Sequence, residues 1–143
     1  MKFGVVNYPG SNAADCYYIF DRVLGHPVSM IMSEERGLDG LDCVVLPGGF
    51  SYGDYLRAGA LAGIAPVTEQ LAEYAEQGGL VLGIGNGFQV LLEAGLLPGA
   101  VRRNKNLLFR CHDVFLRVDN NALPFTGNYS KGEIISFPIA HGQ

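Results

Sequence analysis

The stretch GGLVLGIGNGFQVLLEAG, residues 78–95, decides the fold. Three apolar residues, Leu80 to Leu82, run into a glycine-rich turn at residues 83–87, and residues 88–92 then place apolar side chains at helical spacing. This order predicts a buried strand, a tight turn and the start of a helix. A strand, turn and helix in this order are typical of phosphate-binding loops and also of nucleophile elbows.

The same alternation of strand and helix extends toward the N-terminus. Short apolar runs predict strands in residues 2–7, 27–32 and 43–46, and helices are predicted for residues 13–25 and 59–79. Ser11 or Asn12 can cap the first of these helices, and Gly25 ends it. Strands that alternate with helices at this spacing indicate β-α-β units. Because the strands are continuously apolar, we predict an α/β, doubly wound, mostly parallel sheet with both faces covered.

The pattern changes after Gly99. Residues 106–120 alternate between the two sides of an expected strand, and residues 133–143 contain another apolar run. We therefore expect antiparallel strands appended to the parallel sheet. The sequence contains no internal repeat and no linker, so we interpret residues 1–143 as a single domain. The end of the chain directly after a strand is what a truncated C-terminus would give.

Composition and charge narrow the function classes. The net charge is −4, with 48% hydrophobic and 17% charged residues, which excludes a disordered chain. This charge argues against nucleic-acid or anionic-membrane partners, and we interpret the basic run at residues 102–105 as a solvated turn. Three widely spaced cysteines match no metal pattern and suggest a reducing compartment. No apolar stretch reaches the roughly 18 residues of a membrane span, so we expect a cytoplasmic protein.

The glycine turn fits one functional loop better than the others. A dinucleotide-binding turn needs a third glycine where this chain has Phe88, and a phosphate-binding P-loop needs a Gly-Lys pair that is absent. A nucleophile elbow reads Gly-x-nucleophile-x-Gly, and residues 83–87 match it except at the nucleophile, where Gly85 stands. A glycine-rich turn without chemistry remains the alternative.

A second unusual segment follows the strand at residues 43–46. Residues 46–63 read LPGGFSYGDYLRAGALAG, a long loop at a strand end, where open α/β sheets bind ligands. Pro47 and the two glycines after it could turn backbone amides toward a reacting carbonyl. The aromatic and charged residues that follow are unusual for a loop without a functional role, although an ordinary surface loop is the other interpretation.

These segments carry a family resemblance. Residues 46–60, residues 80–100 and the sequence FPIAHG at 137–142 closely resemble the glutaminase subunits of phosphoribosylformylglycinamidine synthases, which are class I glutamine amidotransferases. The resemblance covers essentially the whole chain. It implies a flavodoxin-like domain that hydrolyses glutamine and passes ammonia to a large synthase subunit, with a small accessory subunit as a further candidate partner. It implies no cofactor or metal in this chain, since the partner uses ATP and Mg²⁺.

The resemblance also implies roles for individual residues. In the family a cysteine at the elbow attacks glutamine, a histidine activates it and an acidic residue orients the histidine. Gly85 stands at the position of that cysteine. The implied oxyanion hole is Gly49, Phe50 and Asn86, and the implied substrate-binding residues are Gly48 and Gln89.

Two departures from the family predict a chain without glutaminase activity. Gly85 has no side chain, so no thioester can form. The family's histidine and acidic residue lie in a Pro-His-Pro-Glu-Arg segment that is not present in these residues. The remaining thiols and imidazoles are interpreted as structural or surface groups: Cys16, Cys43, Cys111, His26, His112 and His141.

Three hypotheses follow from this comparison. The first is an amidotransferase subunit with a changed nucleophile or a shortened chain. The second is a non-catalytic relative that docks on the large synthase subunit as a binding or scaffold module. An unrelated flavodoxin-like hydrolase is the third, and the unusual composition of residues 46–63 argues against it.

Overall fold

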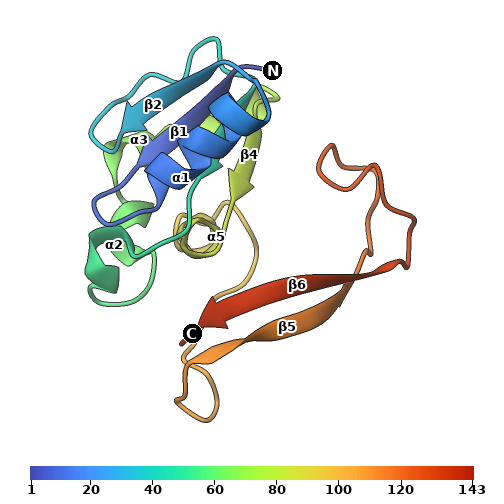
Figure 1. The fold of residues 1–143 in the computed structure, drawn as a ribbon. Helices are drawn as coiled ribbons and strands as arrows, with labels where there is room; N and C mark the ends of the chain where they lie inside the picture. The colour runs from blue at the N-terminus through green and yellow to red at the C-terminus, as the bar shows by residue number, and fades with distance from the viewer. The chain divides into compact units, whose positions relative to one another are not determined.

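A four-stranded parallel sheet forms the centre of the N-terminal part of the chain (Figure 1). The computed structural model describes residues 1–143, which divide into two compact units, Met1–Val101 and Arg102–Gln143. In the first unit the strands are β1 (Phe3–Asn7), β2 (Val28–Met32), β3 (Cys43–Leu46) and β4 (Leu80–Gly83). Their order is β2-β1-β3-β4, with all neighbours parallel. This is the order of flavodoxin-like sheets, as predicted.

Helices cover both faces of this sheet, which confirms the doubly wound prediction. On one face, Ala13 of α1 (Ala13–Tyr18) packs with Val5 and Val45, and Phe20 in the π-helical turn η1 (Ile19–Val23) joins them. On the other face, buried residues of four helices, α2 to α5, pack against Val6, Val44 and Leu46. Figure 1 shows α1 in front of the sheet and α3 behind it.

The prediction of a single helix for residues 59–79 is wrong, because the chain forms three short helices there. They are α2 (Ala60–Gly63), α3 (Pro66–Glu69) and α4 (Leu71–Glu76). Pro66 lacks an N–H and restricts the residue before it, so Ala65 is extended, with ψ 148°, and Pro66 begins a new helix. Asn12 does stand at the start of α1, although its side chain makes no capping hydrogen bond.

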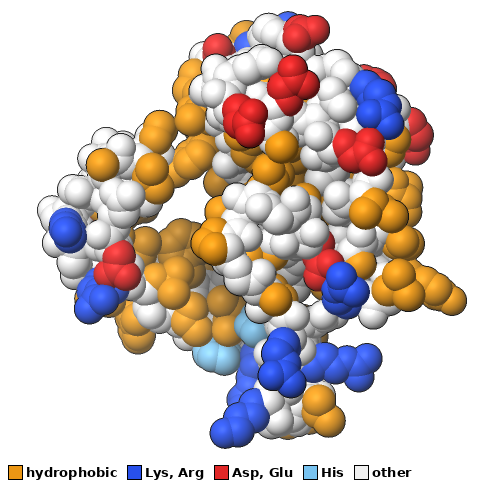
Figure 2. All heavy atoms as spheres, turned by 180° about the vertical axis from the view of Figure 1, so that it is seen from behind, with side chains coloured by type: hydrophobic (Ala, Val, Ile, Leu, Met, Phe, Trp, Pro, Cys, Tyr) orange, Lys and Arg blue, Asp and Glu red, His pale blue; other side chains and the backbone are white.

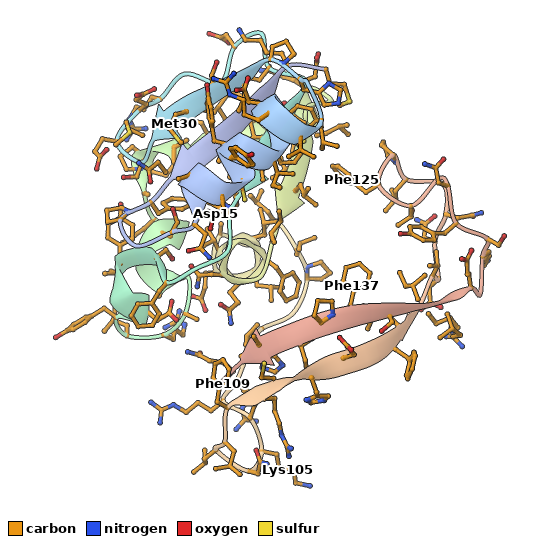
Figure 3. The ribbon with its side chains drawn as sticks, in the orientation of Figure 1. Asp15, Met30, Lys105, Phe109, Phe125 and Phe137 are labelled. Atoms are coloured by element: carbon orange, nitrogen blue, oxygen red, sulfur yellow. The ribbon has the colours of Figure 1, made fainter.

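The second unit contains an antiparallel hairpin, which confirms the prediction of antiparallel strands after Gly99. Strands β5 (Arg110–Arg117) and β6 (Ile134–His141) pair along their whole length, from Arg110 opposite His141 to Arg117 opposite Ile134. They form a sheet of their own and add no strand to the four-stranded sheet. Figure 3 shows Phe137 on β6 and Lys105 at the tip of the loop that precedes β5.

No helix in this structure has the length and apolar character that crossing a membrane would require.

Candidate functional site

Three loops meet at the carboxyl ends of β1, β3 and β4. The Asn12 N–H donates to the Gly48 carbonyl at 2.9 Å, which ties the loop after β1 to the loop after β3. The Ile84 N–H donates to the Leu46 carbonyl, also at 2.9 Å, which ties the loop after β4 to the end of β3. The strand order reverses between β1 and β3, and in sheets of this class ligands bind beside that point.

The loop after β4 has the backbone of a nucleophile elbow. Gly85 has φ 54° and ψ −109°, a conformation that side-chain-bearing residues rarely adopt, and it directly precedes α5 (Asn86–Glu93). A Cβ built at Gly85 would meet only the Gly48 Cα, at 3.8 Å, which is an ordinary contact. The turn therefore has the strained geometry of an elbow, together with space for a side chain that the glycine does not fill.

The two flanking glycines are required for a different reason. A Cβ at Gly87 would lie 2.0 Å from the Leu46 carbonyl oxygen, and one at Gly83 would lie 2.8 Å from the Gly87 carbonyl oxygen. Neither position can hold a larger residue unless the backbone moves. The close approach of α5 to β3 thus depends on Gly87, whereas Gly85 is constrained by its dihedral angles alone.

Of the three backbone amides predicted for the oxyanion hole, two have no acceptor within the chain. They are the N–H groups of Gly49, in the loop after β3, and of Asn86, in the first turn of α5. The Phe50 N–H, which was predicted to join them, donates instead to the Gly10 carbonyl at 3.0 Å. Amides at the start of a helix favour negative charge, so Gly49 and Asn86 are the pair available to an oxyanion.

The Asn86 side chain joins the elbow to the loop after β3. Asn86 is buried, with 6% of its surface exposed, and it hydrogen-bonds to Asp54 and Gln89 and accepts a hydrogen bond from the Ser51 N–H. Burial raises the pKa of the Asp54 carboxyl, and hydrogen bonds from Asn86 and from the Gly59 backbone oppose that rise.

No role for the Asn86 side chain was predicted from the sequence. Its contacts with Ser51 and Asp54 join residues more than thirty positions apart, and no local sequence pattern predicts them. A second link that the sequence did not reveal joins the same two regions, because the Arg57 guanidinium donates to the Glu93 carboxylate at 2.7 Å. The structure places the predicted binding residues Gly48 and Gln89 at this junction. The Gly48 Cα lies 3.8 Å from the position of a Cβ at Gly85, and the Gln89 side chain is hydrogen-bonded to Asn86.

None of the cysteines lies at the elbow. Cys43 is buried at the amino end of β3, and burial raises the pKa of its thiol to about 11. Burial also raises the pKa of Cys16, which lies on α1. Cys111 is exposed on β5, in the second unit, next to His112. Adjacent strand residues point to opposite faces, so Cys111 and His112 do not form a nucleophile–base pair.

A cavity lies at the other end of the sheet. Its volume is about 860 Å³, and its walls include Leu41, Asp42, Tyr74 and Leu80. Leu41, Asp42 and Leu80 lie at the amino ends of β3 and β4, and Tyr74 lies on α4. Ligands of parallel α/β sheets bind at the carboxyl ends instead. We therefore place the candidate site at the elbow. No cluster of three or more His, Cys, Asp or Glu side chains is arranged to hold a metal ion.

Known proteins resemble this chain over its whole length. The subunit PurQ of phosphoribosylformylglycinamidine synthase from Moorella thermoacetica is 55% identical over 144 residues, which cover 100% of this chain and 61% of the relative. The PurQ subunit from Alkaliphilus metalliredigens is also 55% identical, with 64% of its length covered. The chain thus spans less than two thirds of the length of these relatives.

A solved structure agrees with the sequence comparison. A chain in the structure of PurLQS from Thermotoga maritima superposes with a TM-score of 0.89 at 46% identity, covering 99% of this chain and 66% of that one. The CobB/CobQ-like glutamine amidotransferase domain matches residues 4–143. The resemblance seen in the sequence is therefore confirmed, and the chain belongs to the CobB/CobQ-like glutamine amidotransferase domain family.

Proposed function

We propose that this chain forms the glutamine site of a phosphoribosylformylglycinamidine synthase subunit in de novo purine biosynthesis. The observation that carries the proposal is the elbow at Gly85, with φ 54° and ψ −109°, beside the free amides of Gly49 and Asn86. A glutamine side-chain carbonyl placed there would receive two N–H donors. Similarity to the two PurQ relatives over the entire chain supports the same reaction class.

This site has the groups to bind glutamine but lacks the nucleophile that would hydrolyse it. Amide donors and the α5 dipole stabilise negative charge on the carboxamide oxygen of glutamine. Hydrolysis in this family proceeds through a thioester on the elbow side chain, and Gly85 supplies no sulfur atom to form one. An oxyanion hole alone leaves only a small residual rate. We therefore propose that these residues hold glutamine and do not hydrolyse it.

The partner follows from the reaction class. Enzymes of this reaction class pass ammonia from glutamine to an acceptor protein. Similarity to a chain of the PurLQS structure supports a large synthase subunit as the partner, with a small accessory subunit as a further one. ATP and Mg²⁺ would then be bound by the large subunit and not by this chain. A purine-biosynthesis role and three free thiols fit a cytoplasmic location.

The substrate proposal is tested with a thiol placed at the elbow. Gly85→Cys is treated with an electrophilic glutamine analogue, and labelling at each cysteine is followed by mass spectrometry. We expect the analogue to label position 85 faster than exposed Cys111, and L-glutamine to protect position 85 only. The parent chain, in which Cys111 is exposed and Cys16 is half-buried, is the matched control. Equal labelling of both cysteines, or no protection by L-glutamine, would contradict a glutamine site.

A second candidate function is a binding or scaffold module that docks on the large synthase subunit. The glycine at position 85 favours it, since docking needs no nucleophile. Co-purification with the large subunit, together with a titration of L-glutamine binding, separates the two. Stable docking without any glutamine binding supports the scaffold. Glutamine binding supports the amidotransferase site.

A further inference from the structure

Both polar atoms of the Asn86 carboxamide are hydrogen-bonded, to the loop after β3 and to a residue within α5. Its Oδ1 accepts the Ser51 N–H at 3.0 Å. Its Nδ2 donates to Asp54 Oδ1 at 3.0 Å and to Gln89 Oε1 at 3.0 Å. Because a buried amide with unmet donors is unfavourable, these three bonds fix the orientation of the group.

The loop that Asn86 holds has a strained backbone. Tyr52 and Asp54 have φ values of 50° and 49°, in the left-handed region that residues with a Cβ rarely occupy. Such conformations persist where surrounding contacts overdetermine them. From the strand side, the Tyr52 N–H donates to the Pro9 carbonyl at 2.7 Å. In the elbow, Asn86 accepts a hydrogen bond from the Ser51 N–H and donates one to Asp54.

The same carboxamide sets the orientation of the Gln89 amide. Asn86 Nδ2 is a donor only, so the Gln89 oxygen has to face it. Gln89 Nε2 then has no acceptor in the chain and remains free to donate. A free N–H₂ group beside the elbow recognises an oxygen atom of a ligand, such as a carboxylate oxygen of an amino acid.

We infer that the Asn86 side chain is a positioning residue of the glutamine site. It holds residues 51–54 against the elbow, beside the Gly49 amide, and it presents Gln89 Nε2 as a donor to a substrate oxygen. The inference rests on the proposed function for its ligand, but its structural part, the link between residues 51–54 and α5, can be measured without any ligand.

The test exchanges donor and acceptor across the Asn86–Asp54 hydrogen bond. Asn86→Asp keeps an acceptor for the Ser51 N–H but places two carboxylates against each other. Asn86→Asp combined with Asp54→Asn restores a donor–acceptor pair with its polarity reversed. Asn120→Asp is the control, since it makes the same change of charge at an exposed residue in the second unit. Hydrogen exchange of the Ser51 amide and the Kd for L-glutamine are measured for all four chains.

We expect Asn86→Asp to speed Ser51 exchange and to raise the Kd, each by about tenfold or more, because a partly buried hydrogen bond to a charged group is lost. The double variant should regain Ser51 protection. Its glutamine affinity should stay low, because Gln89 now turns its Nε2 toward the carboxylate at position 86. The Asn120→Asp control should match the parent chain in both measurements.

Each other outcome overturns part of the account. Unchanged Ser51 exchange in Asn86→Asp, or no recovery in a folded double variant, would show that Asn86 does not hold residues 51–54. Recovery of glutamine affinity in the double variant would overturn the role assigned to the Gln89 orientation. If the parent chain fails to bind L-glutamine, the proposed function fails, while the exchange measurement still decides the link to residues 51–54.

Discussion

At the scale of single residues, the three glycines of the elbow differ in what they require. Gly87 has no room for a Cβ, and Gly85 has room but an unfavourable backbone conformation. The sequence alone does not distinguish the three glycines, which all belong to one glycine-rich turn. The difference matters for the proposed function, because the position with room is the one that the elbow pattern assigns to the nucleophile.

Alanine substitutions should separate these two requirements. We expect Gly85→Ala to lower the free energy of unfolding by about 1–3 kcal/mol, the cost of one strained backbone position. Gly87→Ala should cost about 3 kcal/mol or more, because its Cβ would lie 2.0 Å from the Leu46 carbonyl oxygen and force the backbone to shift. Gly37→Ala is the matched control, since a Cβ there meets nothing within 4 Å. Urea denaturation measures all three, and a smaller cost for Gly87→Ala than for Gly85→Ala would contradict the geometry.

At the scale of elements, the sequence predicts the strands better than it predicts the helices and loops between them. Apolar runs marked β1, β3 and β4 clearly, because buried parallel strands need continuous apolar residues. The helix predicted for residues 59–79 failed at Pro66, where the restriction on the preceding residue outweighs the helical pattern. The contacts of Asn86 with residues 51–54 were not predictable, since they form only when the strands bring two distant loops together.

The hairpin of the second unit should be locally unstable. None of the residues of β5 or β6 is fully buried, and two-stranded hairpins are marginally stable alone. Figure 2 shows Lys and Arg side chains beside the His side chains at one end of this unit. Amides at the centre of the hairpin, such as Phe115, should exchange roughly a thousandfold faster than that of Val45 in β3. Native-state hydrogen exchange measures this, and similar protection of Phe115 and Val45 would contradict it.

At the scale of the whole molecule, a buried tyrosine links stability to pH. Tyr8 is 1% exposed, its hydroxyl lies 2.6 Å from Thr68 Oγ1, and Thr68 in turn donates to the Ala62 carbonyl. Burial raises the pKa of Tyr8 to about 12, from an ordinary value of 10.0. The unfolded chain therefore ionises first as pH rises, so this contribution to stability is complete below pH 10 and is lost between pH 10 and about 12.

Replacement of this tyrosine should flatten the alkaline part of the stability curve. The parent chain should lose about 3 kcal/mol of unfolding free energy through Tyr8 over that range, at roughly 1.4 kcal/mol for each pKa unit. Tyr8→Phe should be less stable by about 1 kcal/mol at pH 8, from the lost hydrogen bond, but should lose less on going to alkaline pH. Denaturant titrations at a series of pH values test this. Parallel curves for the two chains would be inconsistent with a buried, neutral Tyr8.

The central claim is that this chain binds glutamine at the elbow and does not hydrolyse it. The most direct measurement is a titration of the ¹⁵N-labelled chain with L-glutamine, followed by the backbone amide signals and by ammonia release in the same sample. We predict saturable shifts of the Gly49 and Asn86 amides, with no ammonia formed. Ammonia release, or glutamine binding that leaves both amide signals unmoved, would contradict the claim.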